Sequence, residues 1–235
     1  QPTTVEFRKS DLTTGVELDG ATLTVLDKDG NEIDKWTSVK GEPHIIKRLH
    51  VGETYILREE FAPYGYLKAE EVEFTITDTA EIQKVEMKDD VPIGRIIINK
   101  KGEFLSEVSW NDMVAGAMDS IWGYVTGSLK DVTFEIYARE DIKAADGESD
   151  DYYKKDELVA TIKTDELGIA RTDDLPLGKY YVVEKETADG FVLDGEPRDI
   201  DLTYRDQDTP VVTFDSEWQN SRQKAKVIVT KKEKD

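Results

Sequence analysis

One pattern of short segments occurs twice in this chain of 235 residues. Four segments of the first half have counterparts in the same order in the second half. The pairs are 18–25 with 129–136, 49–52 with 175–178, 55–59 with 180–184, and 62–66 with 187–191. Because a repeated sequence of this length folds as a repeated unit, we predict two domains of one architecture.

The repeated segments have the alternation that is typical of β-strands. Residues 21–26 alternate and lead into the turn sequence of residues 27–31, and further runs follow at 72–76 and 85–87. Gly, Asp, Asn and Pro separate the runs. This spacing favours an all-β fold of two tandem β-sandwiches over a helical or α/β fold.

The domain boundary is expected near residues 91–94. It gives a first domain at 1–91 and a second at 92–223, which insertions enlarge. Residues 224–235 begin the pattern a third time, with Lys231 at the position of the earlier lysines. This tail is predicted to be the first strand of a further, truncated domain, and an ordinary charged terminus is the alternative.

Two insertions distinguish the second copy from the first. Residues 102–127 carry apolar side chains at helical spacing, which predicts a short helix or an ordered loop packed on its own sandwich. The alternative is an exposed surface that binds a ligand. Residues 144–153 are acidic, contain glycine and are expected to form a solvated loop. The apolar residues of the first insertion are Met113, Val114, Ala117, Met118, Ile121 and Trp122.

The composition excludes several classes of function. Hydrophobic residues make up 38% and charged residues 35%, which indicates a folded, well-solvated protein. A formal net charge of −20 argues against binding to nucleic acid or to an anionic membrane. No apolar run reaches the roughly 20 residues that span a bilayer. There is no cysteine, and two histidines alone predict neither a metal site nor a cofactor.

Two lysines lie in phase with the predicted core. Lys9 continues the face of Val5 and Phe7, and Lys100 continues the face of Ile96 and Ile98. A charge that points into a sandwich is costly unless it is paired. Each lysine therefore needs a partner or a chemical role.

Each copy also carries an inward glutamate and an inward Asp or Asn. Strand phase selects Glu59 over Glu60, Asp89 over Asp90 and Lys100 over Lys101. The first set is Lys9, Glu59 and Asp89, and the second set is Lys100, Glu184 and Asn220. A buried, hydrogen-bonded ion pair is the simpler interpretation of each set.

The residues that carry these sets resemble the Cna B-type (SpaA-like) domains of Gram-positive surface adhesins and pilins. The first match comprises residues 7–11, 55–66 and 85–89, with the pattern Tyr-x-x-x-Glu-x-x-Ala-Pro-x-Gly-Tyr from Tyr55 to Tyr66. The second comprises Lys100, residues 180–191 and the strand that ends at Asn220. The resemblance covers nearly the whole chain apart from the insertions, and it implies a transthyretin-like β-sandwich.

The resemblance also implies a spontaneous isopeptide bond in each domain. It would join Lys9 to Asp89 and Lys100 to Asn220, with Glu59 and Glu184 as proton shuttles. The chemistry is sound, because burial favours a neutral amine and a neutral carboxyl group. Fixed strands supply proximity worth roughly 7–11 kcal/mol in favourable cases. Such a bond forms once, so the domain is not an enzyme. Asp89 departs from the commoner Asn partner of the family, so the first bond would form with loss of water and the second with loss of ammonia.

The sequence therefore predicts a structural stalk or shaft segment of an adhesin or pilin, exported and attached to the cell wall of a Gram-positive bacterium. Its expected partners are neighbouring domains of the same protein. One alternative is a module that binds a host protein or glycan through residues 102–127, for which exposure of Trp110, Trp122 and Tyr124 would be evidence. The other is an accessory sandwich of a secreted hydrolase. No LPxTG-type anchor and no Tyr-Pro-Lys pilin motif occur in the sequence, which favours a multidomain stalk over a polymerised shaft subunit.

Overall fold

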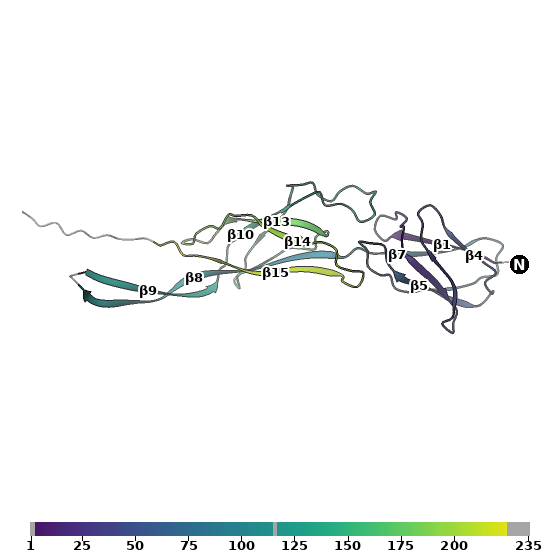
Figure 1. Cartoon of the computed structure of the whole chain (residues 1–235), viewed down its shortest axis with the longest axis horizontal. Coiled ribbons are helices and arrows are strands. Elements are labelled where there is room, and N and C mark those ends of the chain that lie inside the picture. Colours follow the sequence, from purple (N-terminus) through teal and green to yellow (C-terminus); the bar gives the residue numbers. More distant parts are fainter. Residues whose placement is uncertain (1–2, 115–116, 225–235) are drawn as a thin grey trace, which may run out of the picture.

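The computed structural model of the chain describes residues 3–114 and 117–224. Within these ranges every regular element is a β-strand and none is a helix. The strands form two β-sandwiches that follow each other along the chain (Figure 1). The prediction of an all-β fold with two tandem sandwiches is confirmed. Residues 225–235, which include Lys231, lie outside the described residues.

The first sandwich consists of a three-stranded and a four-stranded sheet. The smaller sheet has the order β4-β1-β7, and the larger has the order β3-β2-β5-β6. The strands are β1 (Thr4–Asp11), β2 (Thr22–Leu26), β3 (Glu32–Thr37), β4 (His44–Lys47), β5 (Thr54–Phe61), β6 (Val72–Thr75) and β7 (Gln83–Asp89).

The second sandwich repeats this plan. One sheet has the order β12-β8-β15, with β9 paired to β8, and the other has the order β11-β10-β13-β14. The strands are β8 (Ile93–Val114), β9 (Ala117–Ser128), β10 (Thr133–Ala138), β11 (Leu158–Lys163), β12 (Ile169–Arg171), β13 (Gly178–Glu186), β14 (Arg198–Leu202) and β15 (Val211–Asn220).

The first and last strands of each sandwich are parallel neighbours. β1 pairs with β7 and β8 pairs with β15, whereas the other named strand pairs are antiparallel. A parallel pair needs a long crossover connection, and here that connection is the rest of the domain. The register places Asp11 opposite Asp89, and Gly102 opposite Asn220. In each copy the last strand therefore ends beside the residue two positions after the lysine.

Each sandwich has its own hydrophobic core. Val5, Phe7 and Leu57 are almost fully buried in the first core, and Ile96, Ile98 and Phe134 are fully buried in the second. Successive residues of a strand point to opposite faces, so the alternation read from the sequence selects the buried residues. The lysines extend these buried faces.

The insertion at 102–127 is a β-hairpin, so the predicted short helix is wrong. β8 continues past the sandwich to Val114 and pairs antiparallel with β9. Residues 121–126 are rich in β-branched and aromatic side chains, which favour an extended ladder over the helix that the apolar spacing suggests. The acidic insertion forms the expected loop, closed by a bridge between Ile142 and Tyr153.

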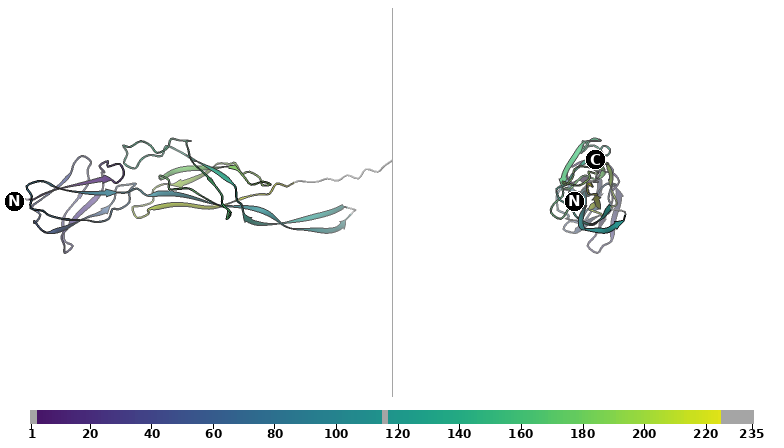
Figure 2. Two further views of the ribbon diagram at one scale, coloured as in Figure 1. Left: turned by 180° about the vertical axis from the view of Figure 1, so that it is seen from behind. Right: turned by 90° about the vertical axis from the view of Figure 1, so that its left-hand side faces the viewer.

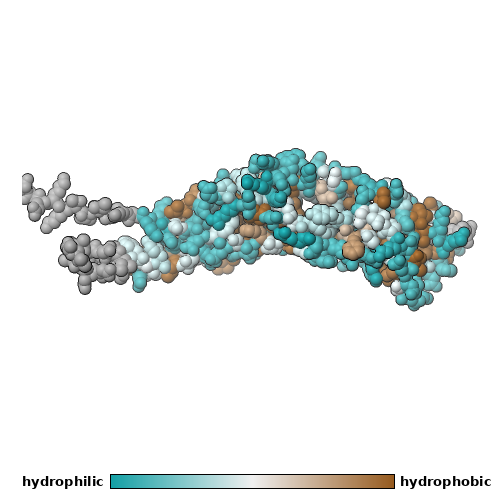
Figure 3. Space-filling view, viewed as in Figure 1, coloured by the Kyte–Doolittle hydropathy of each residue, from teal (hydrophilic) through white to brown (hydrophobic). Residues whose placement is uncertain are grey.

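The molecule is elongated and narrow. The two sandwiches lie end to end, and the β8–β9 hairpin extends beyond the second one, away from the N-terminus (Figures 1 and 2). Most of the face in Figure 3 is hydrophilic, with small apolar areas between. Among the residues described there is no helix that is long and apolar enough to cross a membrane.

Candidate functional site

A lysine and two carboxyl groups meet inside the first sandwich. Lys9 lies on β1, Glu59 on β5 and Asp89 on β7, and their side chains are at most 1% exposed. Glu60 is half-buried and Asp90 is exposed, so the predicted strand phase is confirmed here. The alternation of side chains along β1, β5 and β7 thus brings three ionisable groups together in the buried interior of the sandwich.

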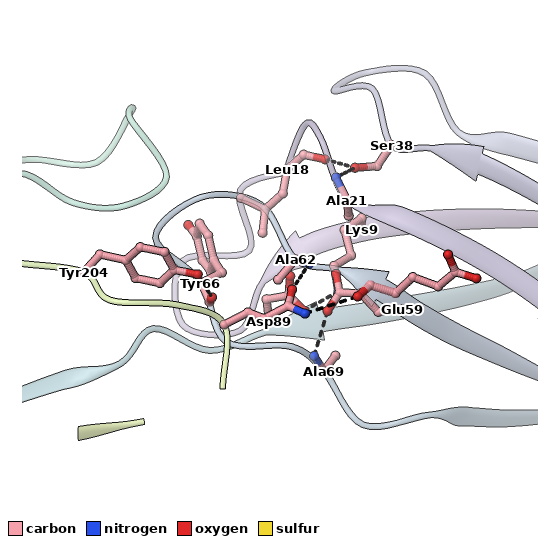
Figure 4. A network of polar contacts seen from close by, with 12 residues as sticks. Lys9, Leu18, Ala21, Ser38, Glu59, Ala62, Tyr66, Ala69, Asp89 and Tyr204 are labelled. Carbon is pink, nitrogen blue, oxygen red and sulfur yellow. Dashed lines mark hydrogen bonds and ion pairs between the residues drawn. The ribbon is translucent and has the colours of Figure 1, made fainter. Parts of the chain in front are cut away.

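The three groups of the first set are in direct contact (Figure 4). Lys9 Nζ donates a hydrogen bond to Asp89 Oδ1 and lies 3.0 Å from Glu59 Oε1. Glu59 Oε2 accepts a hydrogen bond of 2.7 Å from the backbone N–H of Ala69. The amine is therefore held between the two carboxyl groups, and the loop after β5 fixes the orientation of Glu59.

Burial changes the proton affinity of Asp89. It raises the pKa of this carboxyl group to about 7, although the nearby Lys9 ammonium acts in the opposite direction. The neighbouring Glu59 also raises the pKa, because two carboxylates so close together repel each other. Near neutral pH the Asp89 carboxyl group is therefore partly protonated, and a perturbed pKa of this kind is typical of functional sites.

The second sandwich holds the equivalent group. Lys100 Nζ lies 2.6 Å from Glu184 Oε2, and both side chains are at most 3% exposed. Asn220 Nδ2 donates hydrogen bonds to Glu184 Oε1 and to Thr187 Oγ1, the latter at 2.9 Å. Glu184 thus lies between the amine and the amide. Burial lowers the pKa of Lys100, and its pairing with Glu184 opposes that shift.

A β-bulge precedes the end of each glutamate strand at the same place. Leu23 pairs with Glu59 while Thr22 pairs with Phe61, which leaves Glu60 as the extra residue. In the second copy Phe134 pairs with Glu184 while Thr133 pairs with Glu186. A bulge bends its strand and redirects a side chain. The glutamates point inward by ordinary strand alternation, and the shared bulge directly follows each of them.

An aromatic ring lies beside the end of each site, with different chemistry in the two copies. The Tyr66 hydroxyl donates a hydrogen bond of 2.7 Å to Asp11 Oδ2. In the second copy Phe191 packs so closely on Gly102 that a Cβ at this glycine would lie 2.5 Å from the ring. Asp11 and Gly102 are the register partners of Asp89 and Asn220.

Thr187 and Ala69 did not emerge from the sequence as site residues. Thr187 occupies the position of Ala62 in the repeat, and that difference was the available signal. The N–H of Ala69 is a backbone group and leaves no trace in the residue type. The described residues include no group of three His, Asp or Glu side chains that could hold a metal ion.

Comparisons with known proteins agree with this architecture. Residues 3–91 and 124–218 match the family described as SpaA: Prealbumin-like fold domain. These segments make up more than half of the sequence, so the chain belongs to this family, as the resemblance implied. No match was found among curated proteins.

Solved structures with a similar arrangement include the Bacillus anthracis TIE protein. It is 23% identical, with a TM-score of 0.56, and the match covers 93% of this chain and 34% of that protein. This chain therefore spans about a third of the TIE protein. The streptococcal ancillary pilin is 15% identical over 94% of this chain and 62% of its own, with a TM-score of 0.35. The minor pilin GBS52 of Streptococcus agalactiae is 13% identical over 97% and 100%, with a TM-score of 0.38.

Proposed function

We propose that this chain is a load-bearing segment of a bacterial surface stalk or pilus, in which isopeptide bonds close both sandwiches. One observation carries the proposal. At the same register in two copies, a buried lysine contacts a glutamate that also lies beside an Asp or Asn on the last strand. A buried ion pair by itself adds little to the stability of a fold, because the cost of desolvating both charges offsets their attraction.

The contacts in the second site support the following order of events. Proton transfer from Lys100 to Glu184 across 2.6 Å gives a neutral amine and a neutral carboxyl group. A carboxylate only accepts hydrogen bonds, whereas a carboxylic acid also donates. Once Glu184 is protonated, rotation of the Asn220 amide lets the acid donate to the carbonyl oxygen.

Bond formation then follows by addition and elimination. Lys100 Nζ attacks Cγ of Asn220 while the acid gives its proton to the carbonyl oxygen, and Glu184 then takes a proton from the amine of the new C–N bond. Glu184 passes this proton to the amide nitrogen, the old C–N bond breaks, ammonia leaves and the proton on the oxygen returns to Glu184. No electron is gained or lost, and Glu184 ends as the neutral acid, with the proton that Lys100 first gave up.

The first site follows the same scheme with water as the leaving group. Lys9 Nζ is hydrogen-bonded to Asp89, and Glu59 lies within proton-transfer distance of the amine. Lys9 gives a proton to Glu59, and the neutral amine attacks Cγ of the protonated Asp89 carboxyl group. Glu59 gives that proton to the leaving hydroxyl group, which departs as water, and takes one back from the new amide nitrogen. Because each group reacts once, the sandwich is a product of this chemistry and not an enzyme.

The benefit of these bonds would be mechanical. The bond from Lys9 to Asp89 closes a loop of 80 residues, almost the whole first domain. By analogy with a disulfide, closing a loop of this size stabilises the fold by roughly 4–5 kcal/mol. A pull from end to end passes from β1 to β7 and from β8 to β15 through the two bonds.

The fold and the family support a setting on the cell surface. The elongated shape and the serial sandwiches suit a spacer that holds another module away from a surface (Figure 2). In this setting the chain is exported, attached to the wall of a Gram-positive bacterium and joined to neighbouring domains of the same protein.

The mass of the unfolded chain tests this function. Each bond removes one small molecule, so the intact mass should be lower than the sequence mass by one water plus one ammonia. Lys9→Ala should remove only the water loss, and Lys100→Ala only the ammonia loss. A mass equal to that of the sequence would contradict the proposal.

Binding of a host molecule by the hairpin is a second candidate function. Trp122 is 52% exposed, and the nearby Val125 and Leu105 are 54% and 42% exposed. Tyr124 is half-buried, with Lys224 Nζ 4.7 Å from its ring centre, and the Trp110 side chain lies outside the part described. The exposed indole favours this function. Loss of cell adhesion in Trp122→Ser, with both mass losses retained, would support it.

A further inference from the structure

We infer that Gln207, in the second sandwich, is a positioning residue for the bond-forming site of the first sandwich, so that docking of the two domains controls when that site becomes reactive. This inference rests on the proposed function. It starts from a polar contact network that crosses from one domain to the other and ends at the glutamate of the first site.

Gln207 lies in the loop between β14 and β15 and reaches across the domain junction. Its Oε1 accepts a hydrogen bond of 2.8 Å from the N–H of Ala62. Its Nε2 donates a bond of 3.2 Å to the carbonyl oxygen of Glu60, and its own carbonyl oxygen accepts one of 3.0 Å from the N–H of Lys68. One residue therefore holds both ends of the loop at 62–68.

The contact with Glu60 is the most informative of the three. Glu60 is the extra residue of the bulge next to Glu59, and a bulge leaves its extra residue outside the strand ladder. Gln207 donates to the carbonyl oxygen of this extra residue. A residue of the second domain thereby stabilises the backbone directly beside Glu59.

The contact at the far end of the loop, at Lys68, lies next to a hydrogen bond of Glu59. Lys68, which Gln207 holds, precedes Ala69, whose N–H donates to Glu59 Oε2 at 2.7 Å. Both the bulge before the loop and the amide after it thus depend on contacts with the second domain. Glu59 itself is fully buried and touches no residue of that domain by a hydrogen bond that the structure describes.

Tyr204 reinforces the same loop from the second domain. Its hydroxyl donates a hydrogen bond of 2.9 Å to the carbonyl oxygen of Tyr66, and its ring packs against Tyr64 with centres 4.8 Å apart. Figure 4 shows Tyr204 directed at Tyr66, beside Asp89 and Glu59. Tyr66 in turn donates to Asp11, the register partner of Asp89.

The first site depends on the second domain, but the second site does not depend on the first domain. The second site is built from β8, β13 and β15, and the hydrogen bonds of Glu184 and Asn220 go to residues of its own domain. The first site should therefore react only after the second domain has folded and docked, whereas the second site needs no help. A first domain that emerges alone would stay unbonded and able to unfold.

The rate of bond formation in the full chain tests this dependence. The chain is made by cell-free translation, synthesis is stopped, and samples are unfolded at intervals for intact mass. In Gln207→Ala the water loss should be about 10- to 100-fold slower than in the wild type, since small misplacements of reacting groups have effects of this size. The ammonia loss in the same molecules should keep its rate and shows that the second domain folds.

Two further variants separate positioning from simple docking. Gln207→Glu keeps the acceptor for Ala62 but cannot donate to Glu60 when ionised, so its water loss should also slow. Glu148→Gln breaks an exposed ion pair with Lys40 that joins the domains away from the loop, and should leave the rate unchanged. Equal slowing in Gln207→Ala and Glu148→Gln would overturn the assignment of Gln207.

The outcomes also separate this inference from the proposed function. A wild-type chain that never loses water would contradict the proposed first bond itself. A wild type that loses water at the same rate as Gln207→Ala and Gln207→Glu would leave the bond in place and overturn the inference. Loss of both mass changes in Gln207→Ala would mean that the residue acts on folding in general, which would also overturn it.

Discussion

Single residues give the strongest evidence for chemistry in this molecule. A lysine that is only 1% exposed is rare unless it is paired, and here a lysine paired with a buried glutamate occurs twice. Strand phase was enough to predict which of two neighbouring charges is buried, because the side-chain period of a strand is two residues. Thr187 left only one signal, its difference from Ala62 in the repeat, and Gln207 left none, since its contacts cross between domains and no local pattern encodes them.

The first prediction at this scale concerns the glutamates. Glu59→Gln should slow the water loss and Glu184→Gln the ammonia loss, because an amide cannot shuttle protons. The rate of each loss should fall by about 10²–10⁴-fold. Timed intact-mass measurement on each variant checks this, and the unaffected site of the same chain is the control. A normal water loss in Glu59→Gln would show that the amine and Asp89 react unaided.

The second prediction concerns pH at the first site. Because the pKa of Asp89 is raised to about 7, its carboxyl group is mostly protonated below pH 7 and mostly ionised above it. Only the protonated carboxyl group carries the hydroxyl that leaves as water. The rate of water loss should therefore decline through the range from about 6 to 8. Freshly translated chain, diluted into buffers across this range and quenched for mass, provides the test. A rate that rises throughout would contradict the assigned role of the Asp89 proton.

At the scale of elements, the parallel pair of first and last strands positions each site. The alternation of the sequence predicted the strands, and the repeat predicted that both copies share one plan. The hairpin of β8 and β9 was missed because apolar residues at helical spacing also fit the faces of a long two-stranded ribbon. The bulges at Glu60 and its counterpart were also beyond prediction, since a single extra residue leaves no distinct sequence signal.

The close packing of Gly102, on β8, against Phe191 gives a prediction at this scale. Gly102 lies opposite Asn220, and a Cβ there would lie 2.5 Å from the Phe191 ring. Gly102→Ala should force the ring away, destabilise the second domain by about 1–3 kcal/mol and slow the ammonia loss. Chemical denaturation in the Asn220→Ala background measures the stability without the bond. Gly195→Ala is the control for substitution of glycine in general, because Gly195 has no positive φ and its Cβ would meet only the Glu184 carbonyl oxygen, at 3.8 Å. An unchanged stability and rate in Gly102→Ala would contradict this packing argument.

The whole molecule consists of two β-sandwiches in series, and in the proposed function one isopeptide bond closes each of them. The sequence predicted two sandwiches and a surface role from its repeat, its charge and its family resemblance. It did not predict that loops of the second domain contact the loop beside the first site. That coupling depends on how the domains meet end to end, which is a property of the assembled chain.

The response to force is the prediction at this scale. When the chain is pulled by its ends, the bonded domains should not extend, because the force bypasses the residues between each lysine and its partner. In Lys9→Ala one extension step should return, up to roughly 280 Å for the 80 residues released. Single-molecule force spectroscopy measures this step. A step of that length in the wild type would mean that the first domain is not closed.

The most direct test of the central claim is a peptide map of the wild-type chain. After proteolysis, tandem mass spectrometry should find two branched peptides, one joining Lys9 to Asp89 with loss of water and one joining Lys100 to Asn220 with loss of ammonia. Linear peptides with free Lys9 and Lys100 side chains, in place of both branched species, would contradict the account.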